Sequence, residues 1–241
     1  MINSREIVVN EYGIIGTLAF ASVLPYLVAC GTCFIKFSIV FNLLRNAIGL
    51  QQVPSNLTLN GLALLLTVVV MAPIISNTYQ YYIENNVSLA NPESTKNFLN
   101  EGLGTYKEHL AKFADPDLVG FFAKAAISAE TIHAQRTGDN AQLNALQNNP
   151  PKKVAEHSVL VLLPAYALSE INNAFKIGFY IYLPFLVVDL LVSNILLALG
   201  MMMMSPVTIS LPIKLILFVA MDGWNKLVKG LITQYIDLAS I

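Results

Sequence analysis

The chain has 241 residues, of which 55% are hydrophobic and only 12% are charged, and its formal net charge is −1. Soluble domains carry about 25% charged residues, so this composition excludes an ordinary soluble domain. The absence of a positive excess argues against a nucleic-acid-binding protein. A mean hydropathy of +0.60 predicts an integral membrane protein. More than half of the charges lie in 77–157. We therefore expect an apolar helical hairpin over 1–76, a polar helical insert over 77–157 and a second apolar hairpin over 158–241.

Residues 1–11 are polar and lack the basic region and small-residue cleavage site of a secretory signal peptide. We therefore expect the first apolar run, Tyr12–Ile35, to be retained. The segment Lys36–Asn56 contains Lys36 and Arg45 but no acidic residue, which predicts a short cytoplasmic loop. The second apolar run, Leu57–Ile75, then returns the chain to the other side of the membrane.

Two cysteines, Cys30 and Cys33, form a CxxC motif inside the first apolar run. A zinc site needs more ligands than two thiolates, and a redox site needs a polar or electropositive setting. We interpret both cysteines as small packing residues.

The polar insert shows apolar residues at helical spacing on both sides of Asp115-Pro116. This dipeptide is typical of a helix N-cap followed by proline in the first turn. The pattern predicts two amphipathic helices, then a loop over 137–153, in a periplasmic insert. Its three histidines lack metal-ligand spacing, so we expect surface or packing roles for them: His109, His133 and His157.

The C-terminal part contains a half-length apolar run, Ser158–Ala167, and two further apolar runs, Ile177–Leu199 and Leu211–Met221. With the two N-terminal runs this gives four candidate spans, of the roughly 20-residue length that a bilayer requires or near it. An even number of spans places both termini on one side, which conflicts with the distribution of charge at the two ends. The sequence leaves this topology open.

Four charged residues lie in or beside these apolar runs, where an unpaired charge costs several kcal/mol: Glu170, Asp189, Lys214 and Asp222. Glu170 and Lys214 have opposite signs and lie on the two arms of the hairpin. They are candidates for a salt bridge, either within the chain or between copies. Asp189 and Asp222 mark helix ends at the interface or act as ion or proton relays.

The run Met201–Met204 precedes Ser205-Pro206, where a helix must break. Methionine is flexible and polarizable, so the run is either apolar filling or, in a ring of copies, a deformable apolar constriction that gates a pore. Catalytic and nucleotide-binding motifs such as GxSxG, HExxH and the P-loop are absent from the sequence. We therefore expect neither an enzyme nor a cofactor.

Three stretches together resemble the FliP/SctR family, the R-type core subunits of the type III secretion export apparatus. They are GTCFIKFSIVFNLLRNAIGLQQVPSN, LLPAYALSEINNAFKIGFYIYLPFLVVDLL and GMMMMSPVTISLPIKLILFVAMDGW. The resemblance implies an all-α protein of which five copies assemble with small S-type subunits and one T-type subunit, while a U-type switch protein wraps the base. The strings GLQQVPSN and LLPAYALSE resemble the virulence-injectisome branch. In such a gate, set largely above the membrane plane, the apolar runs are buried in protein.

The resemblance also implies roles for individual residues. The methionine run Met201–Met204 corresponds to a gasket that closes the central pore, and Glu170 and Lys214 correspond to a charge pair between neighbouring subunits. The expected function is a structural, pore-forming subunit that conducts unfolded proteins across the bacterial inner membrane. The alternative is a small-solute or ion-coupled transporter with Asp189 and Asp222 as relays. Transporters of that kind show repeated halves, and we find no such repeat in the sequence.

Overall fold

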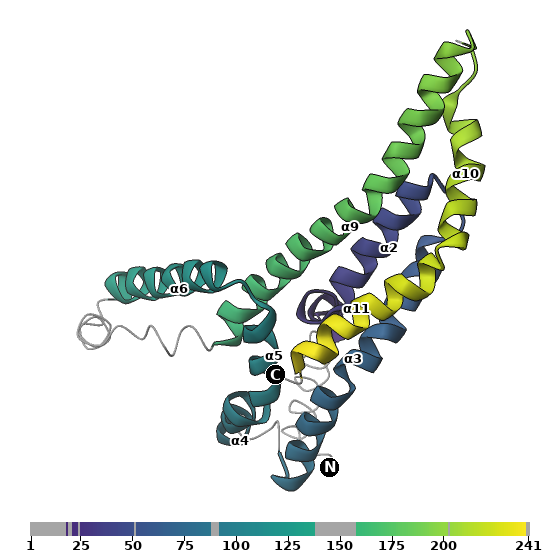
Figure 1. Ribbon diagram of the computed structural model, residues 1–241. Coiled ribbons are helices and arrows are strands. Elements are labelled where there is room, and N and C mark those ends of the chain that lie inside the picture. Colours follow the sequence, from purple (N-terminus) through teal and green to yellow (C-terminus); the bar gives the residue numbers. More distant parts are fainter. Residues whose placement is uncertain are drawn as a thin grey trace, which may run out of the picture.

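The computed structural model describes residues 18, 21–23, 25–50, 52–87, 92–137, 158–201 and 203–239. Regular structure within these ranges is helical throughout, which confirms the predicted all-α class (Figure 1). A short helix over Pro25–Gly31 comes first. The elements that follow are α2 (Phe34–Ile48), α3 (Asn56–Glu84), α4 (Pro92–Asn97), the π-helix η1 (Phe98–Gly102), α5 (Gly104–Phe113), α6 (Pro116–Thr137), α9 (Val159–Ala198), α10 (Pro206–Ala220) and α11 (Gly223–Ala239).

The longest element, α9, has 40 residues and two internal prolines, Pro164 and Pro184. At 1.5 Å per residue it is about 60 Å long, roughly twice the hydrocarbon thickness of a bilayer. The half-length run Ser158–Ala167 and the span Ile177–Leu199, which the sequence analysis separated, are therefore parts of one helix. Figure 1 shows α9 running diagonally through the molecule, with α2 and α10 beside it.

The hydrophobic core lies where α2, α3, α9 and α11 meet, around Phe37, Phe41 and Ala174. The helices α2 and α9 approach closely at Gly178, where an added Cβ would lie 2.2 Å from Leu43 Cδ1. A second cluster joins α2, α9 and α10, and a third joins α5 and α6 to the N-terminal part of α9. The core thus lies around α2 and the first half of α9.

The predicted helices of the insert are present as η1 with α5 and as α6. The helix α6 begins at Pro116, and the carboxylate of Asp115 accepts a hydrogen bond from the backbone N–H of Asp117 at 3.0 Å, as the N-cap pattern predicts. In Figure 1, α6 extends away from the apolar helices. The preceding helix α3 continues through residue 77, where the polar insert was expected to begin, and ends at Glu84. The predicted loop 137–153 lies outside the described residues beyond Thr137.

Within the part of the chain that the structure describes, two helices are long and apolar enough to cross a membrane: α3 and α9. The number rises to four if each bent pair counts as one span: Pro25–Gly31 with α2, bent by 76°, and α10 with α11, bent by 58°. The prediction of a loop over Lys36–Asn56 is wrong, because most of that segment is α2; its cytoplasmic side stays a prediction. Lys36 is fully buried in this helix, so its charge carries no information about a solvent-exposed loop.

Candidate functional site: a methionine turn and buried ion pairs

The methionine run forms a turn at the tip of the α9–α10 hairpin, the end of the molecule farthest from α3 and α4 (Figure 1). The chain leaves α9 through Gly200, whose φ of +73° lies in the left-handed region. The N–H of Gly200 donates to Leu197 O at 3.1 Å, and that of Met201 donates to Leu196 O at 3.0 Å. These two bonds make a Schellman motif, for which glycine is the preferred residue because it has no Cβ.

The described methionines of this turn project away from the rest of the chain. Met203 is fully exposed, at 103% of its reference area, while Met201 and Met204 are about half exposed. The position Met202 lies outside the described residues. The helix α9 ends at Ala198, so the described methionines belong to the turn and not to the helix. Apolar side chains gathered at an exposed tip are typical of an interaction surface.

The second arm of the hairpin begins directly after the methionines. Ser205 occupies the N-cap of α10 and Pro206 its first position, where the missing N–H of proline costs nothing. The backbone carbonyl of Ser205 accepts hydrogen bonds from the N–H and the hydroxyl of Thr208. A Schellman motif on one side and proline on the other therefore fix the ends of the two helices around the methionine turn.

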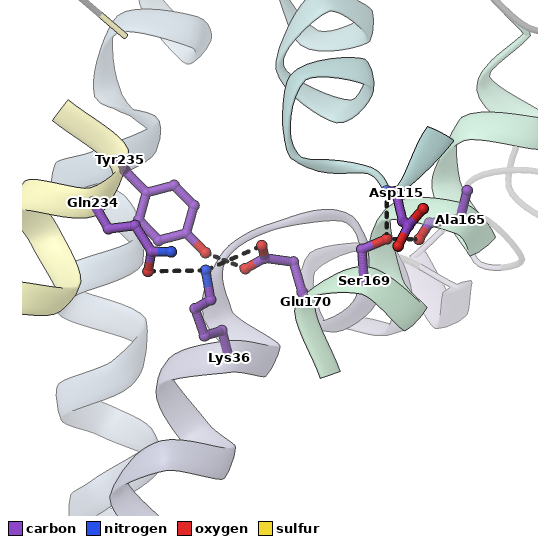
Figure 2. A network of polar contacts seen from close by, with 7 residues as sticks. All are labelled: Lys36, Asp115, Ala165, Ser169, Glu170, Gln234 and Tyr235. Atoms are coloured by element: carbon purple, nitrogen blue, oxygen red, sulfur yellow. Dashed lines mark hydrogen bonds and ion pairs between the residues drawn. The ribbon is translucent and has the colours of Figure 1, made fainter. Parts of the chain in front are cut away.

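A buried ion pair joins α2 to α9 near the base of the hairpin. Lys36 Nζ lies 3.2 Å from Glu170 Oε1, and both side chains are 0% exposed (Figure 2). Tyr235 of α11 donates its hydroxyl to Glu170 Oε2, and Lys36 also donates to Gln234 Oε1 at 3.3 Å. Removing one partner of a buried pair costs about 3–5 kcal/mol, since the other charge is left uncompensated.

The residue before this glutamate ties the insert to the same turn of α9. Ser169 Oγ accepts a hydrogen bond from the backbone N–H of Asp115 at 2.7 Å and donates to Ala165 O at 2.7 Å (Figure 2). Adjacent residues of α9, Ser169 and Glu170, therefore hold the start of α6 on one side and α2 with α11 on the other. We call this network, with Lys36, Gln234 and Tyr235, the base network.

A second ion pair links the two arms of the hairpin to the end of α2. Lys214 Nζ of α10 lies 2.6 Å from Asp189 Oδ2 of α9, with the side chains 8% and 38% exposed. The same ammonium donates to Ala47 O at 3.2 Å. Ala47 is in the last turn of α2, where carbonyls lack helical partners and the helix dipole favours a cation.

The candidate charges Glu170, Asp189 and Lys214 form ion pairs, but with other partners than the sequence suggested. Within the chain, a Glu170–Lys214 salt bridge is wrong, because Glu170 pairs with Lys36 and Lys214 pairs with Asp189. A pair between copies is not a contact of a single chain and stays a prediction. The analysis missed Lys36 because it assigned this residue to a loop. Its apolar neighbours, Phe34, Ile35 and Phe37, were a signal for burial.

The remaining candidate charge, Asp222, lies at the bend between α10 and α11. Its backbone has a φ of +53°, which is uncommon for a residue other than glycine. Its carboxylate accepts a hydrogen bond from Asn225 Nδ2 at 2.8 Å, and its carbonyl accepts from the N–H of Lys226. These contacts stabilise the bend between the two helices.

The described histidines, His109 and His133, lie in different surroundings. His109 packs among the rings of Phe113, Tyr166 and Tyr235, and its Nε2 lacks a hydrogen-bond partner. Burial, together with the charges of Lys112 and Lys36, lowers the pKa of His109 to about 4. His133 is exposed, and His157 lies outside the described residues.

Cys33 is buried in the core and Cys30 is half-buried, both as free thiols. Among the residues that the structure describes, no group of three or more His, Cys, Asp or Glu side chains is close enough to bind a metal ion. The candidate functional features are therefore the methionine turn and the two ion pairs, Lys36–Glu170 and Lys214–Asp189.

Comparison with known proteins places this architecture in a family. The FliP family model matches residues 17–231. Surface presentation of antigens protein SpaP of Salmonella typhimurium is 52% identical over 235 residues, covering 96% of this chain and 99% of that protein. Yop proteins translocation protein R of Yersinia pestis is 43% identical, covering 94% and 97%. Harpin secretion protein HrcR of Erwinia amylovora is 38% identical, covering 91% and 94%.

Proposed function

The chain belongs to the FliP family, in its injectisome branch, and is a subunit of the type III secretion export apparatus; from that premise we propose that it forms a pore. In this proposal it conducts unfolded proteins across the bacterial inner membrane. Its role is structural, and other components supply the energy. The observation that carries the proposal is the turn with the exposed Met201, Met203 and Met204 at the tip of a hairpin whose base is fixed by the buried Lys36–Glu170 ion pair.

A ring of such tips would make the constriction. Flexible thioether side chains from several copies can fill a lumen of changing width, and an apolar constriction resists ion passage by dewetting. A polypeptide that enters from one side would push the side chains apart, and they would close again behind it. The turn itself keeps its geometry, because the Schellman motif and the proline fix the two helix ends.

The assembly that we propose is a homo-pentamer with S-type, T-type and U-type subunits. Its support in this chain is the apolar surface that α9 leaves uncovered toward the tip, including Leu190, Leu191 and Ile195. Faces of this kind need partners, either protein or lipid. In the assembly the insert would lie on the periplasmic side of the inner membrane, with α6 extending from the apolar helices.

A cysteine cross-link tests the pore directly. Met203 is replaced by Cys in a chain whose Cys30 and Cys33 are Ser, and oxidation is carried out in membranes that contain all export subunits. We expect covalent dimers between neighbouring copies, because Met203 is fully exposed at the tip. A matched control places the cysteine at Leu160, which is also highly exposed but lies at the other end of α9. Monomers alone from an assembled complex would contradict a shared axis of methionines.

A charge exchange tests the proposed pair between copies. If Glu170 of one copy pairs with Lys214 of the next, Lys214→Glu should impair assembly and Glu170→Lys should partly restore it. If the contacts within one chain dominate, rescue should follow instead from exchanging Lys36 and Glu170. Rescue of Lys214→Glu by Glu170→Lys would support the pair between copies. Rescue by the exchange of Lys36 and Glu170 alone would support the buried pair within one chain.

The transporter alternative gains no support from the geometry. Asp189, one of its two supposed relays, forms an ion pair with Lys214, and Asp222 stabilises a helix bend. Solute uptake by the purified chain alone would favour the transporter. Dependence of all transport on co-expressed partner subunits would favour the export gate.

A further inference from the structure

A long apolar groove lies between the short helix Pro25–Gly31, α3 and the η1–α5 segment. It encloses about 700 Å³, and its longest wall is a stripe along α3 made of side chains spaced three or four residues apart. The stripe contains Leu64, Val68, Met71, Ile75, Tyr79 and Tyr82. Five of these six side chains are partly exposed, Met71 being the buried one, so the groove is open to the medium that surrounds α3.

The length of the groove favours an extended occupant. From Leu64 to Tyr82 the stripe covers 19 residues of α3, which is about 27 Å at 1.5 Å for each of the 18 steps between them. The lining is almost entirely apolar, so the groove suits an extended hydrocarbon chain that lies along the helix.

The position of the groove on a membrane-spanning helix would bring lipid acyl chains next to it. Its wall α3 is one of the two helices that are long and apolar enough to cross a membrane, and about 27 Å is close to the thickness of the hydrocarbon region. Two tyrosines, Tyr79 and Tyr82, line the groove near the C-terminal end of α3, which is Glu84. Tyrosine is enriched at the level of lipid headgroups, which places the ester region of a lipid at this end.

A polar pocket of about 350 Å³ continues the groove at the tyrosine end. Phe98 of η1 lines both cavities, and its ring contacts Tyr81 on the polar side and Tyr82 on the apolar side. Among the described residues that line the polar pocket, the charged ones are Glu93 and Glu101, both acidic. An acidic pocket complements a cationic group, and the zwitterionic headgroup that carries an ammonium provides one.

We propose that this site binds one phospholipid with an ammonium headgroup. One acyl chain lies in the groove along α3, and the ammonium lies in the pocket beside Glu101. The π-helix η1 forms the junction, which agrees with the frequent use of π-helical turns at functional sites. The proposal depends on a membrane location and not on protein conduction, so its failure would leave the proposed pore untouched.

The acyl chain is tested by photolabelling of the full chain in vesicles of phosphatidylethanolamine with a diazirine in one acyl chain. We expect label on the α3 stripe, and we expect Val68→Trp, which fills the groove, to lower it about tenfold through lost apolar contact. The matched control is Leu65→Trp, three positions earlier on α3, exposed and outside the groove. It should leave labelling of the stripe unchanged.

Two outcomes of this labelling would overturn the proposal. An unlabelled stripe would mean that protein fills the groove, either another part of this chain or a partner. Labelling that Val68→Trp does not change would mean ordinary contact with the bilayer. If Val68→Trp fails to fold, Ile75→Trp blocks the same groove two turns further along α3.

The headgroup is tested by exchanging it while keeping the acyl chain. Labelling should be stronger in phosphatidylethanolamine than in phosphatidylglycerol vesicles, and Glu101→Gln should reduce the preference about threefold, as expected for a partly exposed charge pair. The Glu101→Gln variant should keep the labelling of the groove itself. Equal labelling by both lipids in the unmodified chain would contradict an ammonium site.

Discussion

The two ends of α9 are built in opposite ways. Around Glu170 the helix is packed by α2, α11 and the start of α6, and the charges of Lys36 and Glu170 pair with each other. Around Leu196 the same helix is covered on one side only, and it is followed by a turn of exposed methionines. Contacts within one chain therefore fix the arrangement at the base. At the tip, apolar side chains stay exposed until a partner covers them.

The contrast has a physical cause in the type of interaction at each end. Buried ion pairs and hydrogen bonds are directional, so a base built from them has one arrangement. Methionine contacts are non-directional and adapt to many shapes. A directional base beneath an adaptable tip is what a gate requires, because the tip can move around a substrate while its anchor stays in place.

The largest effect is expected from breaking the base network. Glu170→Ala leaves Lys36 buried without a counter-charge and should lower the free energy of unfolding by about 3–5 kcal/mol. Thermal unfolding in detergent measures it. Asp189→Ala is the control, since a partly exposed pair contributes about 1 kcal/mol or less. Joint replacement of Lys36 and Glu170 by Met should recover most of the loss, and equal losses at Glu170 and Asp189 would contradict the contrast.

The second-largest effect is expected from acid, which protonates the buried His109 near the base of the hairpin. The pKa of His109 is about 4 in the folded chain and 6.5 in its reference state, so the unfolded chain binds the proton first as the pH falls. The contribution of His109 to stability is therefore present above pH 6.5 and is lost as the pH falls toward 4. A loss of about 2–3 kcal/mol corresponds to a shift of this size.

The measurement for His109 is the unfolding midpoint at pH 7 and at pH 4.5. His109→Phe keeps a ring in the aromatic cluster and removes the titration, so its midpoint should fall less than that of the unmodified chain. The same fall in both proteins would assign the acid sensitivity to other groups.

A smaller effect is expected where α2 and α9 approach most closely. Gly178→Ala places a methyl group 2.2 Å from Leu43 Cδ1, so Leu43 must change rotamer or the helices must separate. Overpacking of this kind costs about 1–3 kcal/mol. Combining Gly178→Ala with Leu43→Ala should restore much of the stability in a thermal unfolding series. If Leu43→Ala does not reduce the loss of stability caused by Gly178→Ala, the loss arises from the backbone and not from the contact with Leu43.

The smallest effect on stability is expected at the tip. Replacing Met201, Met203 and Met204 by Ala removes exposed side chains and should change the free energy of unfolding by less than about 0.5 kcal/mol at each position. The same variant should leak ions when assembled, because the proposed constriction is lost. Conductance at the parental level would refute the gasket, and failure to assemble would show that the tip also holds the complex together.

The sequence predicted the elements better than their partners. Composition and periodicity predicted the helical class, and Asp115-Pro116 located the start of α6 correctly. Local patterns succeed in such cases because capping and helical spacing depend on neighbours in sequence. The position of the methionine turn followed in the same way from Ser205-Pro206.

Errors arose where distant residues decide the structure. The polar residues around Glu170 separated two apolar runs in the sequence, yet α9 continues through them, because α2 and α11 provide a counter-charge and a hydroxyl for the glutamate. Lys36 was assigned to a loop because its counter-charge, Glu170, is distant in the sequence. A sequence read in one dimension does not reveal that residues 36, 170 and 235 meet.

The length of α9 has a consequence for the life of the protein in the cell. A helix of about 60 Å with a predominantly apolar 40-residue sequence is longer than the hydrocarbon region of one bilayer. A newly made chain therefore exposes apolar surface until other subunits cover it. Membrane proteases recognise unassembled subunits of this kind. We therefore expect the cellular half-life of the chain to be set by how quickly it is captured into the complex, so that assembly itself controls how many export gates a cell contains.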